Sequence, residues 1–197
     1  MSHAGRWNTR NTLKLALFLA VTAAALTPVR AAIAQDALDA ASATRIRKEY
    51  LDDMDSVHVR FMALAKAIPA DKYSWRPGPG VRSVSEVFMH IVGEWYFYGP
   101  QSVGGKPPAD FGVPKDKLPA LEKITAKDQV IAELDKSWAY CKAQIGGVDA
   151  KTLTGKYKPW GQTLSSAALG MEGDQHEHLG QLIAYSRSVG VKPPWSK

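Results

Sequence analysis

The feature that most constrains the fold is a repeat of apolar residues at every third or fourth position, found in four separate segments. In the first segment, from about Thr44 to Ala67, the repeat consists of Ile46, Tyr50, Met54, Val57, Phe61 and Leu64. An α-helix brings residues at this spacing onto one face, so each segment predicts an amphipathic helix. No segment alternates convincingly between apolar and polar residues, which argues against a sheet.

Helix-breaking and helix-capping residues separate the first two segments. Pro69 ends the first predicted helix, and a stretch rich in proline and glycine follows at residues 76–80. Ser83 can then cap a second helix, with Glu86 three residues later as its capping-box partner. We expect this second helix to continue to about Tyr98.

A long connection joins the second predicted helix to the third. Residues 99–125 are rich in proline, glycine and lysine, and they are numerous enough to cross the bundle. The third helix is predicted from about Thr125 to the Gly146-Gly147 pair, and the fourth over residues 165–188. The sequence therefore predicts an all-α four-helix bundle with a long crossover between helices two and three.

The first 34 residues have the composition of a cleavable secretory signal peptide. Three basic residues precede an apolar run from Leu15 to Leu26, and Ala-Ile-Ala at residues 32–34 offers the small residues of a cleavage site. The run is shorter than the roughly 20 apolar residues of a membrane-spanning helix. We therefore expect cleavage after Ala34, export to the periplasm or the medium, no stable membrane span afterwards, and a short linker at residues 35–43.

Charge and cysteine content exclude further classes of protein. Removal of residues 1–34 takes away four basic residues and no acidic ones, which lowers the net charge from +6 to +2. The remainder has no stripe of lysine and arginine interleaved with aromatic residues, so we expect no nucleic-acid partner. The single cysteine, Cys141, excludes an internal disulfide, and its place in an apolar row predicts a packed, inert thiol.

Two polar residues interrupt the apolar row of the fourth predicted helix. Asp174 and His178 lie one turn apart and share a side with Met171 and Leu182. A carboxylate and an imidazole in such a buried row need partners, which are an ion pair, a set of hydrogen bonds or a metal ion.

A second polar pair lies on the second predicted helix, where Glu94 follows His90 by one turn. Facing helices with a carboxylate and a histidine one turn apart are a common way for bundles to build metal sites. One interpretation of these residues is that His90, Asp174 and His178 hold one divalent metal ion. The alternative is structural: Asp174 and His178 form a surface pair, and His90 is a core histidine bonded to a backbone carbonyl.

Two other residues are candidates for catalysis beside such an ion. Glu94 follows His90, and His58 lies among the apolar positions of the first predicted helix, so either is a candidate proton acceptor or outer contact. His176 lies two positions from His178 and is expected to face solvent. The motifs of serine hydrolases, nucleotide-binding loops and zincins do not occur in the sequence.

Two long stretches of the chain resemble a known family. They read IPADKYSWRPGPGVRSVSEVFMH at residues 68–90 and EHLGQLIAYSRSVGVKPPWS at residues 177–196. Both are similar to the DinB-like family, also described as the damage-inducible or YfiT-like metalloenzymes. The resemblance covers essentially all of residues 44–197 and implies a four-helix-bundle domain there, often assembled as a homodimer.

The resemblance also implies a divalent metal ion, Zn, Ni, Mn or Fe, held by one histidine of helix two and two residues of helix four. Position by position, His90 matches the helix-two ligand and His178 the last ligand. Family members usually have a histidine where this chain has Asp174. Two histidines and one carboxylate leave open positions on such an ion for water or substrate.

Members of this family are linked to metal-dependent hydrolysis and to the transfer of low-molecular-weight thiols. The resemblance therefore implies a metal-dependent enzyme that acts on a small molecule, whose identity the sequence does not give. A cytosolic thiol would be poorly supplied outside the cytoplasm, which favours hydrolysis. The alternative is a non-enzymatic exported binding or stress-related bundle with a degenerate metal site.

Overall fold

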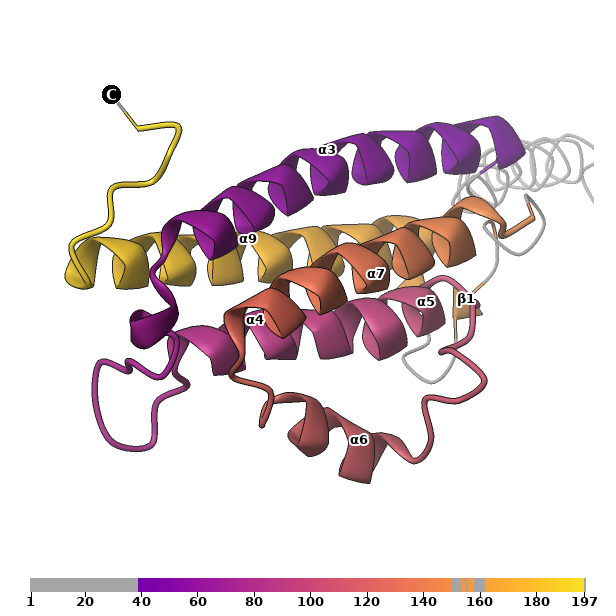
Figure 1. Ribbon diagram of the computed structural model, residues 1–197. Coiled ribbons are helices and arrows are strands. Elements are labelled where there is room, and N and C mark those ends of the chain that lie inside the picture. Colours follow the sequence, from indigo (N-terminus) through magenta and orange to yellow (C-terminus); the bar gives the residue numbers. More distant parts are fainter. Residues whose placement is uncertain (1–38, 150–153, 155, 158–161, 197) are drawn as a thin grey trace, which may run out of the picture. The chain divides into compact units, whose positions relative to one another are not determined.

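Helices account for nearly all of the regular structure in the computed structural model of the protein (Figure 1). The structure describes residues 39–149, 154, 156–157 and 162–196. The predicted signal peptide at residues 1–34 lies outside the described residues, as does the first part of the predicted linker. Among the described residues, no helix combines the length and the apolar composition that a membrane span requires.

The long helices form the predicted all-α bundle. Their bounds are α3 (Ala40–Ala67), α4 (Val84–Gly93) continued by η3 (Glu94–Tyr98) and α5 (Gly99–Ser102), α7 (Lys127–Gly146) and α9 (Leu164–Ser188). Helices α3 and α4 each pack against both α7 and α9, which closes the four-helix arrangement (Figure 1). The first helix begins at Ala40, before the predicted start, because the Asp39 side chain caps it by accepting a hydrogen bond from Ser42 N at 2.7 Å.

The core of the bundle consists of the predicted apolar repeats. Met54, Phe61 and Leu64 of α3 are fully buried, and so is Trp95 of the second helix. The Trp95 ring lies 5.7 Å from Phe61 and 5.4 Å from Trp138 of α7, measured between centroids. Burial of each such side chain contributes about 1.5–3 kcal/mol, so these rows supply much of the free energy that holds the helices together.

The second helix changes its winding where it reaches Glu94. From Glu94 to Tyr98 it is a π-helix, and the N–H of Gly99 donates to the carbonyl oxygen of Glu94, five residues earlier. A β-carbon on Gly99 would lie 2.6 Å from the sulfur of Cys141, so only glycine allows α7 to approach this closely. Cys141 is buried, as predicted, and burial raises the pKa of its thiol.

The crossover between the second helix and α7 contains a short helix that the sequence did not predict. Helix α6 (Pro114–Leu121) lies against α4 (Figure 1). A β-carbon on Gly93 would lie 2.7 Å from Cδ2 of Leu118, so a larger residue here would require the Leu118 side chain to move. Before α9, the two-residue strands β1 (Lys156–Tyr157) and β2 (Gln162–Thr163) pair antiparallel, with Lys156 opposite Thr163.

The predicted capping box at the start of α4 is confirmed. Oγ of Ser83 accepts a hydrogen bond from Glu86 N at 3.3 Å, and Oε2 of Glu86 accepts one from Ser83 N at 2.6 Å. These two bonds satisfy N–H groups that have no partner within the helix. They fix the first turn of the helix that carries His90 and Glu94.

Loss of this cap should destabilise the protein measurably. Substitution Ser83→Ala removes the acceptor for Glu86 N, and we expect the free energy of unfolding to fall by about 1 kcal/mol. Urea denaturation followed by circular dichroism measures the change. Ser56→Ala, at an exposed position of α3, is the control and should leave the stability nearly unchanged. Equal stability of the two variants would contradict the role of the cap.

Candidate metal centre

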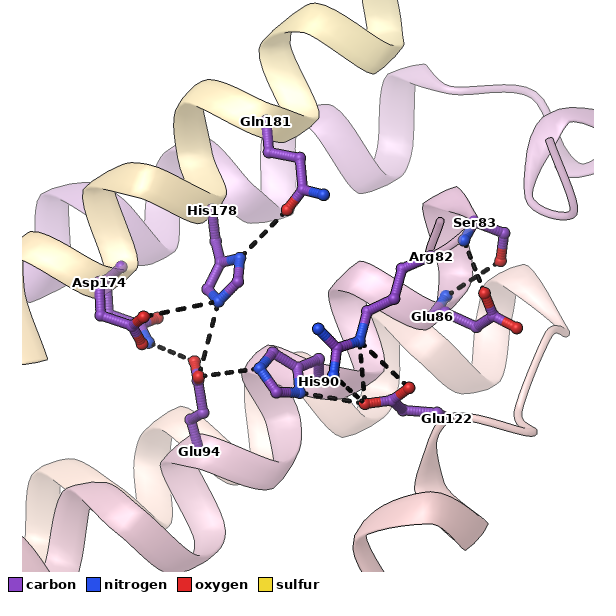
Figure 2. A network of polar contacts seen from close by, with 10 residues as sticks. Arg82, Ser83, Glu86, His90, Glu94, Glu122, Asp174, His178 and Gln181 are labelled. Atoms are coloured by element: carbon purple, nitrogen blue, oxygen red, sulfur yellow. Dashed lines mark hydrogen bonds and ion pairs between the residues drawn. The ribbon is translucent and has the colours of Figure 1, made fainter. Parts of the chain in front are cut away.

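Two histidines and one glutamate from two helices converge inside the bundle (Figure 2). Nε2 of His90 lies 3.1 Å from Oε1 of Glu94, one turn later on the same helix. Nε2 of His178, on α9, lies 3.5 Å from the same oxygen. The three ligand-type atoms all lie within 4.8 Å of one another, and we call these residues the His90 cluster.

The charges of the cluster are coupled to one another. Burial raises the pKa of Glu94, but hydrogen bonds and charges from His178 and His90 outweigh burial and hold that pKa well below its usual range. Hydrogen bonds to Glu122 and to Glu94 raise the pKa of His90 to about 9. Burial lowers the pKa of His178, yet the hydrogen bond and the charge of Glu94 outweigh it, so this pKa is also raised. Protonated imidazoles thus balance a carboxylate that is only 6% exposed.

Two of the separations between these atoms also suit a divalent ion. Two ligand atoms that each lie about 2.1 Å from an ion, at bond angles of about 90° to 110°, are about 3.0 to 3.4 Å apart. The His90–Glu94 separation of 3.1 Å lies within this interval, and the His178–Glu94 separation of 3.5 Å lies just above it. Imidazole and carboxylate are ligands that Zn, Mn, Fe and Ni accept.

Outer contacts hold each of the three ligand-type groups in place (Figure 2). Nδ1 of His90 lies 3.0 Å from Oε1 of Glu122, and Nδ1 of His178 lies 3.2 Å from Oε1 of Gln181. If Nδ1 carries the proton toward these acceptors, Nε2 of each ring is the free ligand atom and faces Glu94. Buried Gln175 donates from Nε2 to Oε2 of Glu94 at 2.7 Å, which leaves Oε1 for an ion. The residues present therefore fit a divalent metal ion.

The comparison with protein-family models decides the family. Residues 53–182, well over half of the chain, match the model of the DinB superfamily. The protein belongs to the DinB superfamily. The comparisons with curated proteins and with solved structures found no match. Superfamily membership and the ligand-type groups of the His90 cluster fit a metal-dependent function.

The predicted ligands of this DinB-superfamily protein lie close together, but not all in one group. The rings of His90 and His178 are 5.1 Å apart between centroids. Oδ1 of Asp174 lies 3.8 Å from Nε2 of His178, at the edge of the cluster and outside its group of three atoms. Burial and the charge of Glu94 raise the pKa of Asp174 to about 6. A ligand role for Asp174 stays a prediction, because in this structure Glu94 completes the group.

The two catalytic candidates from the sequence have different positions. Glu94, expected as a proton acceptor or outer support, lies between the two imidazoles. His58 of α3 packs edge-on against Trp95 at 5.7 Å and stacks on Trp138 at 6.2 Å, and its Nε2 lies 3.5 Å from Oδ1 of Asp135. These contacts tie His58 to the core and to α7, and a catalytic role for it stays a prediction.

A second group of ligand-type residues lies at the surface between α3 and α9. Nε2 of His176 is 2.8 Å from Oδ2 of Asp53, and Glu172 is the third member of the group. The side chain of His176 is exposed, as predicted, and exposed pairs of this kind are common without an ion. His176 therefore serves as a comparison for His90 in metal-binding experiments.

Sequence reasoning missed Glu122 and Gln175. Glu122 follows α6 in the crossover, and Arg82 donates from Nε to both of its carboxylate oxygens at 3.2 Å. No repeat places a crossover residue beside His90, which is 32 positions away in the sequence. Gln175 had a signal in the sequence, because it follows Met171 by four positions and so shares the inward side of the fourth helix, where an amide needs a polar partner.

Two cavities of about 320 Å³ each flank the cluster. One lies on the crossover side and includes Arg82, His90 and Glu122 in its wall. The other, which we call the Asp174 cavity, lies between α9 and the π-helix with α5. Its wall consists of Glu94, Tyr98, Ser102, Ala167, Gly170, Met171 and Asp174.

The His90 cluster should bind one Zn²⁺ per chain. Loss of an outer partner of a metal ligand costs about 10- to 100-fold in affinity, so His90→Ala and His178→Ala, which remove ligands, should cost at least as much. Elemental analysis of untagged protein after dialysis against Zn²⁺, with titration calorimetry, measures both stoichiometry and affinity.

The control for this experiment is His176→Ala, which should retain the ion. Glu94→Gln and Asp174→Asn test the contribution of each carboxylate to zinc binding. We expect Glu94→Gln to weaken zinc binding more than Asp174→Asn does. Unchanged affinity in His90→Ala would show that the ion does not bind at this cluster.

Zinc uptake at pH 7 should release protons. The pKa of His90 is raised to about 9, so its ring carries a proton at pH 7, whereas a metal ligand must be neutral. Affinity should therefore increase with pH until the pH exceeds this pKa. Calorimetry in two buffers of different ionisation enthalpy counts the protons, and we expect at least one per ion. No proton release would contradict the raised pKa.

Proposed function

We propose that this protein is an exported metal-dependent hydrolase that acts on a small molecule. The observation that carries the proposal is the convergence of His90, Glu94 and His178 at ligand spacing, with both histidine Nδ1 atoms held by outer partners. Export belongs to the proposal and rests on the signal-peptide composition of residues 1–34.

The protein's own residues would divide the work as follows. His90, Glu94 and His178 hold a divalent ion, which supplies Lewis acidity and lowers the pKa of water when it is bound. Gln175 and Glu122 keep the ligands oriented. The sequence predicted Asp174 as a ligand and Glu94 as a candidate proton acceptor. In this proposal the two roles are exchanged, so that Glu94 is a ligand.

Asp174 is the residue that we assign to proton transfer. It lines the Asp174 cavity, and its Oδ1 lies 3.8 Å from Nε2 of His178, beside the cluster. During hydrolysis the oxygen of water adds to the substrate carbonyl carbon, and the bond to the leaving group breaks. Oδ1 of Asp174 accepts the proton that water loses and returns it to the leaving group.

Hydrolysis is favoured over thiol transfer, the other reaction linked to DinB-like proteins. A thiol-transfer enzyme needs a supply of a low-molecular-weight thiol, and export would separate the protein from the cytosolic pool. Hydrolysis needs only water as the second substrate.

The test compares turnover of ester and amide substrates with conjugation of a thiol to an electrophile. Zinc- or manganese-loaded protein should hydrolyse, and chelation should abolish the activity. Asp174→Asn should lower kcat by roughly 10²- to 10⁴-fold with metal content unchanged, because it removes the proton acceptor. Asp53→Asn, in the surface pair with His176 between α3 and α9, is the matched control.

Two results would overturn the proposal. Thiol conjugation without hydrolysis would identify a thiol transferase. Metal-free protein without turnover, whose stability does not respond to His90→Ala, would support a non-enzymatic binding bundle.

A further inference from the structure

The Asp174 cavity adjoins the His90 cluster directly, because Glu94 belongs to both. Its floor and sides are formed by the second helix and by α9, the same elements that carry the cluster. A substrate in this cavity would therefore lie against Glu94, one of the three members of the cluster. Its volume of about 320 Å³ is near the lower end of the range for small-molecule sites, about 300–1,000 Å³.

The wall of the cavity combines apolar surface with acidic groups. Ala167 and Met171 of α9 supply apolar contacts, and Glu94 and Asp174 supply carboxylates. The described residues that line the cavity include no lysine or arginine. An anionic substrate would therefore meet two carboxylates and no basic side chain of the wall.

A divalent ion in the cluster does not reverse this argument. Its two positive charges would be matched by the negative charges of Glu94 and Asp174, so the loaded site would be close to neutral. Arg82, in the wall of the cavity on the crossover side, is already paired with Glu122 at 3.1 Å.

We propose that the Asp174 cavity is the substrate site and that it selects a small uncharged molecule with a short apolar group, such as a neutral amide or ester. This inference rests on the proposed function and narrows it, because it excludes carboxylate-bearing thiols and other anions as preferred substrates.

The test uses two probes of equal size that differ in charge, pentanamide and pentanoate. Their dissociation constants for the zinc-loaded protein are measured by ligand-observed NMR. Pentanamide should bind at least tenfold more tightly than pentanoate. Asp174→Asn removes one wall charge and should reduce this preference several-fold.

A second variant locates the probe. Gly170 lies in the wall, and a β-carbon there meets no atom within 4 Å, so Gly170→Leu can fill the cavity without a backbone clash. It should weaken pentanamide binding at least tenfold and leave zinc stoichiometry unchanged. Gly180→Leu, at an exposed position of α9 that is equally open, is the matched control and should bind the probe normally.

The outcomes separate this inference from the proposed function. Zinc binding with pentanoate bound as tightly as pentanamide would overturn the substrate class and leave the hydrolase proposal standing. Normal pentanamide binding in Gly170→Leu would overturn the location of the site. Absence of zinc from the cluster would overturn both proposals.

Discussion

The site depends on a carboxylate that is buried between two imidazoles. Removal of Glu94 from water would be costly if the group had no partner, yet its pKa is lowered because His90 and His178 both face it. In addition to the hydrogen bond from Gln175, positive charge balances this carboxylate, and protons on the rings or a divalent ion can provide it. Ring protons and a metal ion would occupy the same nitrogen atoms, so they compete for Nε2 of His90 and of His178.

The apolar rows bring His90 and His178 toward the same part of the bundle, and features outside the apolar repeat complete the site. The π-helix begins at Glu94, and Gly99 at its end lets α7 pack against the second helix. π-Helical turns often occur at functional sites, since the extra residue changes which side chains point inward. The crossover adds Glu122, whose contact with His90 joins an irregular segment to the centre of the bundle.

The bundle could be predicted from the sequence because each long helix buries a continuous apolar row. Such a row is visible in the sequence as apolar residues at every third or fourth position. The proximity of His90 and His178 also followed, since both interrupt such rows. The place of Glu94 between them did not follow. The sequence put Glu94 one turn after His90 on the same face, but the usual family pattern assigned the third ligand to position 174, which here is Asp174. Helix α6 has Pro119 in its interior and only one buried residue, so its local pattern is weak. The contact of Glu122 with His90 could not be predicted either, because Glu122 directly follows this weakly patterned helix.

The distribution of the ligand-type atoms over two helices has a consequence for cohesion of the bundle. His90 and Glu94 belong to the second helix and His178 to the last, so a bound ion would act as a removable cross-link between distant parts of the chain. Such a link forms only in the native arrangement and therefore shifts the folding equilibrium by mass action. The concentration of free metal ion around the protein would then determine how strongly the second and the last helix are held together.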